Sequence, residues 1–274
     1  MQLSIHFSKD LVHSYNMNCI IFTGGNYPQK DRISHFLEPL KDNAVVIAAD
    51  SGLNTAKAYN IKPDYFLGDM DSVDAESVAW FKSFERTEKG APGAAAHQKP
   101  QNIETFPEDK DYSDTELAIR KAKSLGADFT VLIGGAGGRL DHLLGILELF
   151  KGAYKPDLWL AEENAVLFAD AAGHSDLSIS GLTENAPVSV FPVFQTDCTD
   201  KADKEYSCKS ENLVWPLDGL DWQGGAISLS NRRKPLTDKD GKDMPVRLNI
   251  QKGSFIVILP LSASFSFSTA NAEI

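Results

Sequence analysis

The chain has 274 residues, of which 42% are hydrophobic and 24% are charged, a balance that is typical of globular proteins and excludes fibrous and wholly disordered classes. A chain of this length forms one or two domains and can bury roughly 75% of its unfolded surface without disulfides or metals. Its 38 acidic residues exceed its 27 Lys and Arg, so the formal net charge is −11. This excess of negative charge disfavours binding to nucleic acids and to anionic membranes.

The sequence also predicts the compartment. No apolar run approaches the roughly 20 residues of a membrane-spanning helix, and the N-terminus lacks the unbroken apolar stretch of a signal peptide. Three cysteines without C-x-x-C spacing do not indicate a disulfide framework. We therefore expect a cytoplasmic protein.

The N-terminal part of the chain alternates predicted strands and helices after an extension. Residues 1–17 show no clean periodicity and are predicted to be an N-terminal extension, ending at a second methionine. An α/β domain is predicted over residues 18–156, because short apolar runs alternate with helical patterns across short connections, as in a mostly parallel, Rossmann-like sheet. The strands are predicted at 19–22, 44–49, 65–67, 103–106 and 129–133, and the helices at 32–40, 53–59, 74–84, 114–125 and 141–150.

One helix and one loop in this domain have clear local signals. Ser113 and Glu116 form an S-x-x-E capping box at the start of the helix predicted over 114–125, and Gly126 ends it. Residues 89–100, rich in Gly, Ala and Pro, predict an exposed loop.

The pattern changes after Pro156. Short strand-like runs are separated by Asn, Gly, Asp and Pro, without a helical period, which is typical of an antiparallel β-sandwich. This second domain is predicted over 157–274, with long polar loops at 195–211 and 232–243. Its strands are predicted at 158–160, 166–169, 177–179, 188–194, 226–229, 246–250 and 255–259.

Acidic side chains follow several predicted strands of the first domain. Because the carboxyl ends of parallel strands meet at one edge of a sheet, where open α/β folds bind ligands, we expect these side chains to share one crevice. Such a cluster of carboxylates is costly unless a cation lies within it, and oxygen ligands favour Mg²⁺ that bridges substrate phosphates. The residues are Asp50, Asp69, Asp71, Asp111 and Asp114.

A glycine-rich turn complements the acidic residues. Gly134 to Gly138 lie between a strand and a helix, where backbone N–H groups can face an anion, and Arg139 adds a planar guanidinium. The turn is neither a dinucleotide fingerprint nor a Walker A motif. Each motif alone also fits an ordinary turn or helix cap. Together they predict a Mg²⁺-dependent enzyme that acts on a phosphorylated small molecule.

Four motifs in order resemble the thiamine pyrophosphokinase family over residues 18–170. They are Ala49-Asp50-Ser51-Gly52-Leu53-Asn54, Gly68-Asp69-Met70-Asp71-Ser72, Lys110-Asp111-Tyr112-Ser113-Asp114 and Gly134-Gly135-Ala136-Gly137-Gly138-Arg139-Leu140-Asp141-His142. Looser similarity continues in Leu213-Val214-Trp215-Pro216-Leu217 and Ser228-Leu229-Ser230-Asn231.

The resemblance implies a homodimer whose active sites lie between subunits and transfer pyrophosphate from ATP to the thiamine hydroxyl, releasing AMP. It implies Mg²⁺ ligands at Asp50, Asp69, Asp71 and Asp114, and catalytic roles for Asp71, Asp111, Asp114 and Arg139. It implies thiamine contacts from Trp215, Ser230 and Asn231, where a cationic thiazolium can lie against the indole. The ATP-binding residues would be Asp50, Ser51, Asn54, Gly68, Ser72, Lys110, Ser113, Gly134, Gly135, Gly138, Asp141 and His142.

Departures from the family pattern leave two alternatives open. The family commonly has two glycines after the first aspartate, whereas this chain has Ser51, and residues 89–100, 195–211 and 232–243 resemble insertions. One alternative is a diphosphokinase that acts on another hydroxymethyl heterocycle, such as a pterin. The other is a module that senses a nucleotide or thiamine without turnover.

Overall fold

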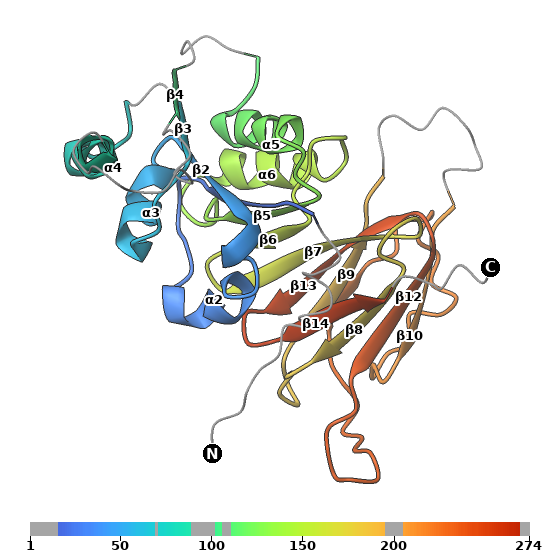
Figure 1. The fold of residues 1–274 in the computed structure, drawn as a ribbon. Coiled ribbons are helices and arrows are strands. Elements are labelled where there is room, and N and C mark those ends of the chain that lie inside the picture. The colour runs from blue at the N-terminus through green and yellow to red at the C-terminus, as the bar shows by residue number, and fades with distance from the viewer. Residues whose placement is uncertain (1–15, 69–70, 89–101, 106–110, 195–204, 269–274) are drawn as a thin grey trace.

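The computed structural model describes residues 16–68, 71–88, 102–105, 111–194 and 205–268. The chain forms a ten-stranded sheet with helices on both faces and a four-stranded sheet packed against one end of it (Figure 1). The strand order is β11-β9-β13-β7-β6-β5-β1-β2-β3-β4 in the large sheet and β10-β12-β8-β14 in the small one. The predicted fold class, an α/β sheet followed by an antiparallel sandwich, is confirmed.

The first six strands form the parallel half of the large sheet. β1 pairs with β2 and β5, β2 with β3, β3 with β4, and β5 with β6, all in parallel. Every residue of β1 and β5 is buried, as expected where helices cover both faces of a sheet. The six strands are β1 (Asn18–Phe22), β2 (Ala44–Ala49), β3 (Tyr65–Gly68), β4 (Asn102–Thr105), β5 (Phe129–Ile133) and β6 (Leu158–Leu160).

Helices connect these strands and cover them. The helix α2 packs on one face of the sheet through Ile33 and Phe36, whereas α5 and α6 pack on the other face through Ile119 and Ile146. α2 ends at Leu37 rather than at the predicted residue 40, because a turn and a short 3₁₀ helix (Lys41–Asn43) follow it. The helices are α2 (Lys30–Leu37), α3 (Gly52–Tyr59), α4 (Ala75–Glu88), α5 (Asp114–Ser124) and α6 (Leu140–Leu149).

The start of α5 forms one half of the predicted capping box, and the Glu116 carboxylate accepts hydrogen bonds from Arg120 of the same helix. Ser113 Oγ accepts a hydrogen bond from the backbone N–H of Glu116 at 3.2 Å, which satisfies one of the unpaired donors of the first turn. Lys121 and Lys123 lie in the last turn, where the helix dipole favours cations. The first turn of α5 is thereby fixed at the edge of the sheet.

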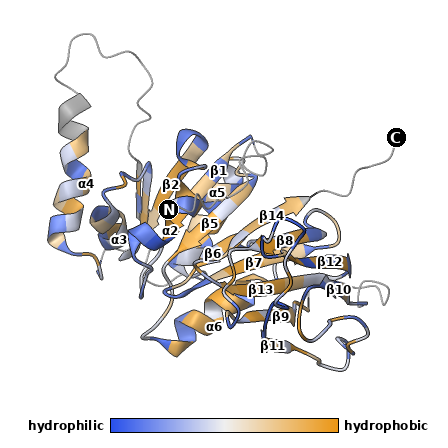
Figure 2. Cartoon of the chain, turned by 90° about the horizontal axis from the view of Figure 1, so that it is seen from below, coloured by the Kyte–Doolittle hydropathy of each residue, from blue (hydrophilic) through white to orange (hydrophobic). Residues whose placement is uncertain are grey.

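The C-terminal strands are antiparallel and contribute to both sheets. β7, β13, β9 and β11 extend the large sheet, and β8, β10, β12 and β14 form the small one. Their inner faces enclose one apolar core, so that hydrophobic segments run along the strands (Figure 2). The strands are β7 (Asn164–Asp170), β8 (Asp176–Ser180), β9 (Val188–Pro192), β10 (Ser207–Glu211), β11 (Ser228–Asn231), β12 (Val246–Lys252), β13 (Ser254–Pro260) and β14 (Ser264–Ser268).

Two strands depart from the sequence prediction. Residues 195–211 were predicted to be a loop, but Ser207–Glu211 form β10, a polar edge strand in which Cys208 alone is fully buried. β14 was not predicted, although its alternating Ser and Phe residues place Phe265 in the core. The predicted loop at 89–100, and residues 1–15 of the predicted extension, lie outside the described residues.

The predicted domain boundary between residues 156 and 157 stays a prediction. Strands from both sides of it share the large sheet, and Phe36 of α2 contacts Phe265 of β14 with ring centroids 5.8 Å apart. In the described part of the chain, no helix has the length and apolar character needed to cross a membrane.

Phe36→Ala tests whether the two halves share one core. Phe36 is fully buried, so we expect the substitution to lower the free energy of unfolding by about 3–5 kcal/mol. Because its core cluster includes residues of both sheets, one cooperative thermal transition should move to lower temperature. Calorimetry checks this, with the exposed Leu229→Ala as the control. Two transitions of which only one moves would contradict a shared core.

Candidate active site

The carboxyl ends of four neighbouring parallel strands, β5, β1, β2 and β3, open at one edge of the large sheet. A cavity of about 710 Å³ lies there, a size typical of small-molecule sites. Its lining comes from the turns after these strands, from the start of α5 and from α6. The lining residues are Thr23, Gly24, Gly25, Asn26, Asp50, Ser51, Asp71, Ser72, Ser113, Asp114, Thr115, Gly135, Gly137, Gly138, Arg139, Asp141, His142, Gly145 and Ile146.

Most of the sequence-predicted site residues in the α/β half line this cavity. Asn54, Gly68, Gly134 and Asp111 do not: Asn54 accepts a hydrogen bond from the N–H of Asp74 at 3.2 Å, just before α4. Asp69 and Lys110 lie outside the described residues. The predicted residues that line the cavity are Asp50, Ser51, Asp71, Ser72, Ser113, Asp114, Gly135, Gly138, Arg139, Asp141 and His142.

Asp50 has an unusual backbone conformation at the end of β2. Its φ is 49°, in the left-handed region that non-glycine residues rarely adopt. The N–H of Asp50 donates to Leu67 O at 2.7 Å, and a Cβ on Gly68 would lie 3.1 Å from the Asp50 Cα, so β3 approaches closely. Ser72 Oγ donates to Asp50 Oδ2. Such local strain is typical of functional sites.

The other carboxylate oxygen of Asp50, Oδ1, is buried and makes no hydrogen bond within the described residues. A buried carboxylate oxygen without a partner is costly, and a cation would satisfy it. Asp71 and Asp114 line the same cavity. No three His, Cys, Asp or Glu side chains in the described part of the chain are grouped closely enough to hold a metal ion by themselves. The donor set suits an ion that also binds water and a ligand's oxygens.

The glycine turn after β5 differs from the prediction that its N–H groups face an anion. The N–H of Gly134 donates to Leu160 O at 3.2 Å, that of Gly135 to Gly24 O at 2.6 Å, and that of Ala136 to Asn26 O at 3.3 Å. Within the described residues, the N–H groups of Gly137 and Gly138 make no hydrogen bond to the chain. The part of the turn that can bind an anion is therefore confined to its second half.

Sequence reasoning missed the turn after β1, which forms a wall of the cavity. Thr23 Oγ1 lies 2.6 Å from Thr115 Oγ1 of α5, so this wall is bonded to the helix that carries Asp114. The Thr23-Gly24-Gly25 run directly follows a predicted strand, and the strand-end rule applied to it would have found the turn. The other lining residues that were missed are Asn26, Thr115, Gly145 and Ile146.

Arg139 is the cation of the glycine turn, and its guanidinium holds a neighbouring carboxylate. Nη2 donates to Asp141 Oδ2 at 2.5 Å and Nε donates to Oδ1 at 3.2 Å. This hydrogen bonding lowers the pKa of Asp141 to about 2. Both side chains are exposed, so water screens the pair and an incoming anion can exchange with Asp141 at little cost.

The predicted residues of the C-terminal half lie away from the cavity. Trp215 is 54% exposed, and its backbone is held by the buried amide of Asn231, which accepts from the Trp215 N–H at 3.2 Å and donates to its carbonyl at 2.6 Å. The Arg232 guanidinium lies 5.3 Å from the indole centroid. Ser230 is exposed and has a φ of 50°. The fold thus presents one indole to solvent on a firmly held loop.

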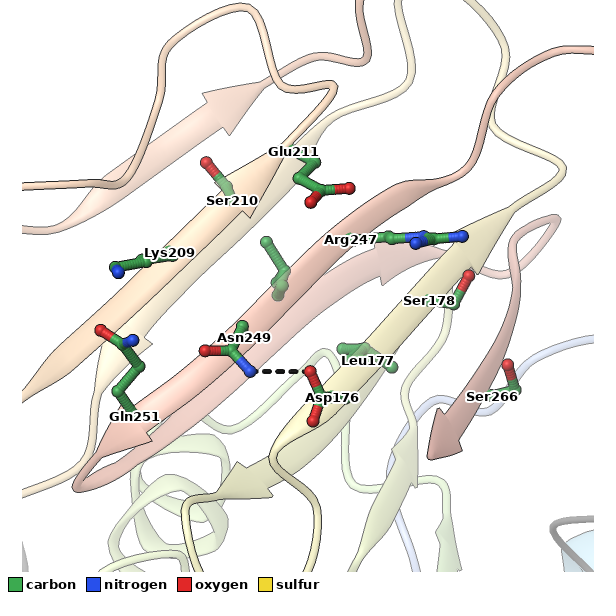
Figure 3. Close-up of a pocket in the computed structure, with 11 residues that line it drawn as sticks. Asp176, Leu177, Ser178, Lys209, Ser210, Glu211, Arg247, Asn249, Gln251 and Ser266 are labelled. Carbon is green, nitrogen blue, oxygen red and sulfur yellow. Dashed lines mark hydrogen bonds between the residues drawn. The ribbon is translucent and has the colours of Figure 1, made fainter. Parts of the chain in front are cut away.

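A second hollow, of about 620 Å³, lies on the outer face of the small sheet (Figure 3). Polar side chains of β8, β10 and β12 surround it, and Asn249 Nδ2 donates to Asp176 Oδ1 at 2.7 Å in its centre. None of the sequence-predicted site residues lines this hollow. The cavity at the edge of the large sheet is therefore the candidate active site.

Comparison with known proteins points to one family. Residues 36–160 match the family described as thiamin pyrophosphokinase, catalytic domain. Over 112 residues the chain is 30% identical to a thiamine pyrophosphokinase of Bacillus subtilis (strain 168). These matched residues make up 40% of this chain and 45% of the Bacillus subtilis protein. The matched segment thus spans less than half of the curated relative.

Solved structures share the fold over most of the chain. A thiamin pyrophosphokinase from Geobacillus thermodenitrificans has a TM-score of 0.60 at 19% identity and covers 94% of this chain and 100% of its own. The Candida albicans thiamin pyrophosphokinase has a TM-score of 0.56 at 13% identity, covering 93% and 92%. At these identities the likeness concerns the fold, including the C-terminal sheets that the family match does not reach.

Trp159→Phe tests what anchors the glycine turn. The buried Trp159 donates its indole N–H to Gly134 O at 2.6 Å. Phenylalanine retains an aromatic ring but leaves that carbonyl unpaired, so the free energy of unfolding should fall by about 1–3 kcal/mol in urea titrations. The control is Trp80→Phe, because this half-buried indole lies on α4, where it packs against Phe84, and is remote in sequence from the glycine turn. Equal losses in the two variants would contradict the anchoring role.

Proposed function

We propose, from the premise that residues 36–160 belong to the thiamin pyrophosphokinase catalytic-domain family, that this protein transfers a pyrophosphoryl group from ATP to the hydroxyl of thiamine. The products are thiamine diphosphate and AMP. The observation that carries the proposal is the single cavity in which three aspartates from separate turns meet the glycine turn and Arg139. The family match alone covers too little of the chain to assign the acceptor.

The reaction exchanges one phosphorus–oxygen bond for another. The thiamine hydroxyl oxygen forms a bond to the β-phosphorus of ATP, and the bond from that phosphorus to the oxygen bridging the α- and β-phosphates breaks, so AMP leaves with that oxygen. The hydroxyl proton passes to a carboxylate, for which we propose Asp114, which lines the cavity, or Asp111, which precedes it by three residues and is not part of the lining. This kind of transfer depends on positioning and charge stabilisation rather than on a nucleophilic side chain.

The aspartates fit a Mg²⁺ ion that accompanies ATP. Asp50, Asp71 and Asp114, with Asp69, would hold it, and the buried Oδ1 of Asp50 without a hydrogen-bond partner in the described chain supports this assignment. When bound, the ion neutralises phosphate charge and orients the phosphates. Ser72, which donates to the other oxygen of Asp50, keeps that carboxylate turned toward the cavity.

The phosphates of ATP bind at the second half of the glycine turn. The N–H groups of Gly137 and Gly138 are not used by the described chain, and Arg139 exchanges Asp141 for a phosphate oxygen. Gly135 and Ser51 contribute to the shape of the cavity, with Ser51 Oγ lying 2.3 Å from the position of a Cβ on Gly24. His142 and Ser113 complete the proposed nucleotide contacts at the ends of two helices.

Thiamine binding requires a second copy of the chain in this proposal. Neighbouring strands lie about 4.8 Å apart, so β11, which carries Ser230, is roughly 24 Å from β5 and roughly 34 Å from β2 across the sheet. One thiamine cannot bridge that distance within one chain. In a homodimer, Trp215 and Ser230 of one subunit can face the cavity of the other, and the exposed indole suits the cationic thiazolium.

The direct assay uses purified protein, ATP and Mg²⁺ with thiamine, with a hydroxymethyl pterin, or with no acceptor. We expect AMP and thiamine diphosphate to form only with thiamine. AMP formed with the pterin alone would favour the other diphosphokinase. Nucleotide binding without AMP formation would favour a sensing module.

Asp71→Ala tests the acidic wall of the cavity. We expect thiamine-dependent AMP formation to fall by about 10²-fold or more, because one charge that holds and orients Mg²⁺–ATP is lost. The melting temperature should change little, since Asp71 is exposed. Asp42→Ala, an exposed aspartate outside the cavity, is the control and should retain activity. Full turnover by the Asp71 variant would remove this residue from the site.

Mixing two defective variants tests the shared site. Trp215→Ala should raise the KM for thiamine by about 2- to 30-fold, so it turns over slowly at low thiamine. When the Trp215→Ala and Asp71→Ala chains are coexpressed, about half of the dimers contain one chain of each kind, and each of these heterodimers has one intact site of two. About a quarter of wild-type activity should therefore return. Coexpression of Asp71→Ala with Asp114→Ala should restore no activity, because both residues line the cavity of the α/β half and each site of such a heterodimer would lack one of them. No recovery in the first mixture would contradict a site between subunits.

A further inference from the structure

Arg120 of α5 contacts two aromatic rings and a carboxylate at the same time. Its guanidinium carbon lies over the rings of Tyr112 and Tyr154, 4.0 Å from each ring centroid. Its Nε and Nη2 groups donate to Glu116 Oε1 at 3.0 and 2.8 Å. The ring faces attract the planar cation in addition to the carboxylate. We call these four side chains the arginine stack.

The arginine stack connects two segments that are distant in sequence. Tyr112 lies just before α5 and folds back over Arg120, eight residues later. Tyr154 lies between α6 and β6 and packs against the core cluster that contains Ile119 and Phe150. Because Tyr154 is anchored in the core, Arg120 attaches Tyr112 to a fixed base.

Tyr112 directly precedes two residues of the candidate active site. Ser113 and Asp114 line the cavity, whereas no member of the arginine stack is part of its lining. The contact between the hydroxyls of Thr23 and Thr115 holds this turn on the cavity side. The arginine stack, in which Tyr112 is 42% exposed, holds the turn on the solvent side. The two contacts together fix where the Asp114 carboxylate can reach.

The arginine stack needs an arginine rather than any cation. A lysine at position 120 could still pair with Glu116, four residues earlier in the helix. It could not lie flat against a ring while donating two hydrogen bonds to one carboxylate, because only the guanidinium is planar. The helix has other supports, since Ala118 and Ala122 are buried and Ser113 caps its first turn. The planar cation therefore serves the contact with the two rings.

We infer that Arg120 is a positioning residue for Asp114. By holding Tyr112 against Tyr154, it sets the direction from which the Asp114 carboxylate enters the cavity. The inference rests on the proposed function, in which Asp114 helps to hold Mg²⁺–ATP. Displacing a metal ligand lowers both the rate and the metal affinity. Thiamine affinity, which the proposed function assigns to the half that contains Trp215, should not depend on Arg120.

Steady-state kinetics of Arg120→Lys and Arg120→Gln on the full chain test this role. In both variants we expect kcat to fall by about 10-fold and the Mg²⁺ concentration for half-maximal AMP formation to rise by about 10-fold. The KM for thiamine should stay within about 2-fold of the wild type. Unchanged kcat and Mg²⁺ dependence in both variants would overturn the inference, as would a rise in the thiamine KM alone.

Arg32→Lys is the matched control. Arg32 of α2 also pairs with a glutamate, since its Nη1 donates to both carboxylate oxygens of Glu163 at 2.7 Å, and it lies outside the cavity. Its kcat and Mg²⁺ dependence should equal those of the wild type. Equal kinetic losses in the Arg32 and Arg120 variants would contradict a specific role for the arginine stack.

Tyr154 separates positioning from a general loss of stability, because it lies outside the cavity. Tyr154→Phe retains the ring and should keep wild-type kinetics, whereas Tyr154→Leu should reproduce the kinetic losses of Arg120→Gln. A protein with both Tyr154→Leu and Arg120→Gln should lose no more than either variant alone, since both changes break one stack. Multiplied losses would overturn the inference, and so would an equal loss in Tyr154→Phe.

Binding of Mn²⁺–ATP, followed by electron paramagnetic resonance, distinguishes failure of this inference from failure of the proposed function. About 10-fold weaker binding by Arg120→Gln than by the wild type would support the positioning role even if thiamine were not the acceptor. Equal binding by the two proteins would overturn it. If the wild type bound no Mn²⁺–ATP at all, the proposed function would fail together with this inference.

Discussion

Two adjacent strand ends are bonded to each other at the edge of the large sheet, and the candidate site depends on this contact. The Gly135 N–H donates to Gly24 O, and the Asn26 N–H donates to Ala136 O, both at 2.6 Å. Because the two turns approach so closely, a Cβ at Gly25 would lie 2.9 Å from Ala136 O and one at Gly134 would lie 2.5 Å from Thr23 O. The turns after β1 and β5 therefore act as one wall, and α6 is attached to it through Ile146, whose Cδ1 lies 2.2 Å from the position of a Cβ on Gly135.

The charges around the cavity follow from this arrangement. Asp50, Asp71 and Asp114 reach it from separate turns, while Arg139 is the one Lys or Arg among its described lining residues, and that side chain holds Asp141. An acidic cavity in a chain of net charge −11 repels a bare polyphosphate. A nucleotide that arrives with a divalent cation brings the charge that this site lacks. The charges that line the cavity thus support the proposed use of Mg²⁺–ATP.

Local patterns in the sequence predicted much of this molecule, and the failures have physical causes. The capping box at Ser113 and the apolar runs of β1, β2 and β5 depend on neighbouring residues, so they could be recognised directly. β10 could not, because an edge strand that buries only Cys208 lacks the apolar alternation that indicates a strand. The alternation in Ser264–Ser268 was present and was overlooked.

In the candidate site, too, features set by local sequence could be predicted, whereas contacts between residues far apart in sequence could not. The rule that parallel strand ends converge correctly brought Asp50, Asp71, Asp114 and Arg139 to one cavity. It could not tell which N–H groups of the glycine turn remain available, because their partners, Gly24 and Asn26, are more than a hundred residues away in sequence. The role of Asp69 and Lys110, which lie outside the described residues, stays a prediction from the motifs.

The most direct test of the account is a crystal structure of the full chain with Mn²⁺ in place of Mg²⁺ and an ATP analogue that cannot be cleaved between its α- and β-phosphates. The account predicts an anomalous Mn²⁺ peak bonded to carboxylate oxygens of Asp50, Asp71 and Asp114 and to the phosphates, which would lie against Gly137 to Arg139. A nucleotide bound elsewhere, or a Mn²⁺ ion that touches none of these aspartates, would contradict it.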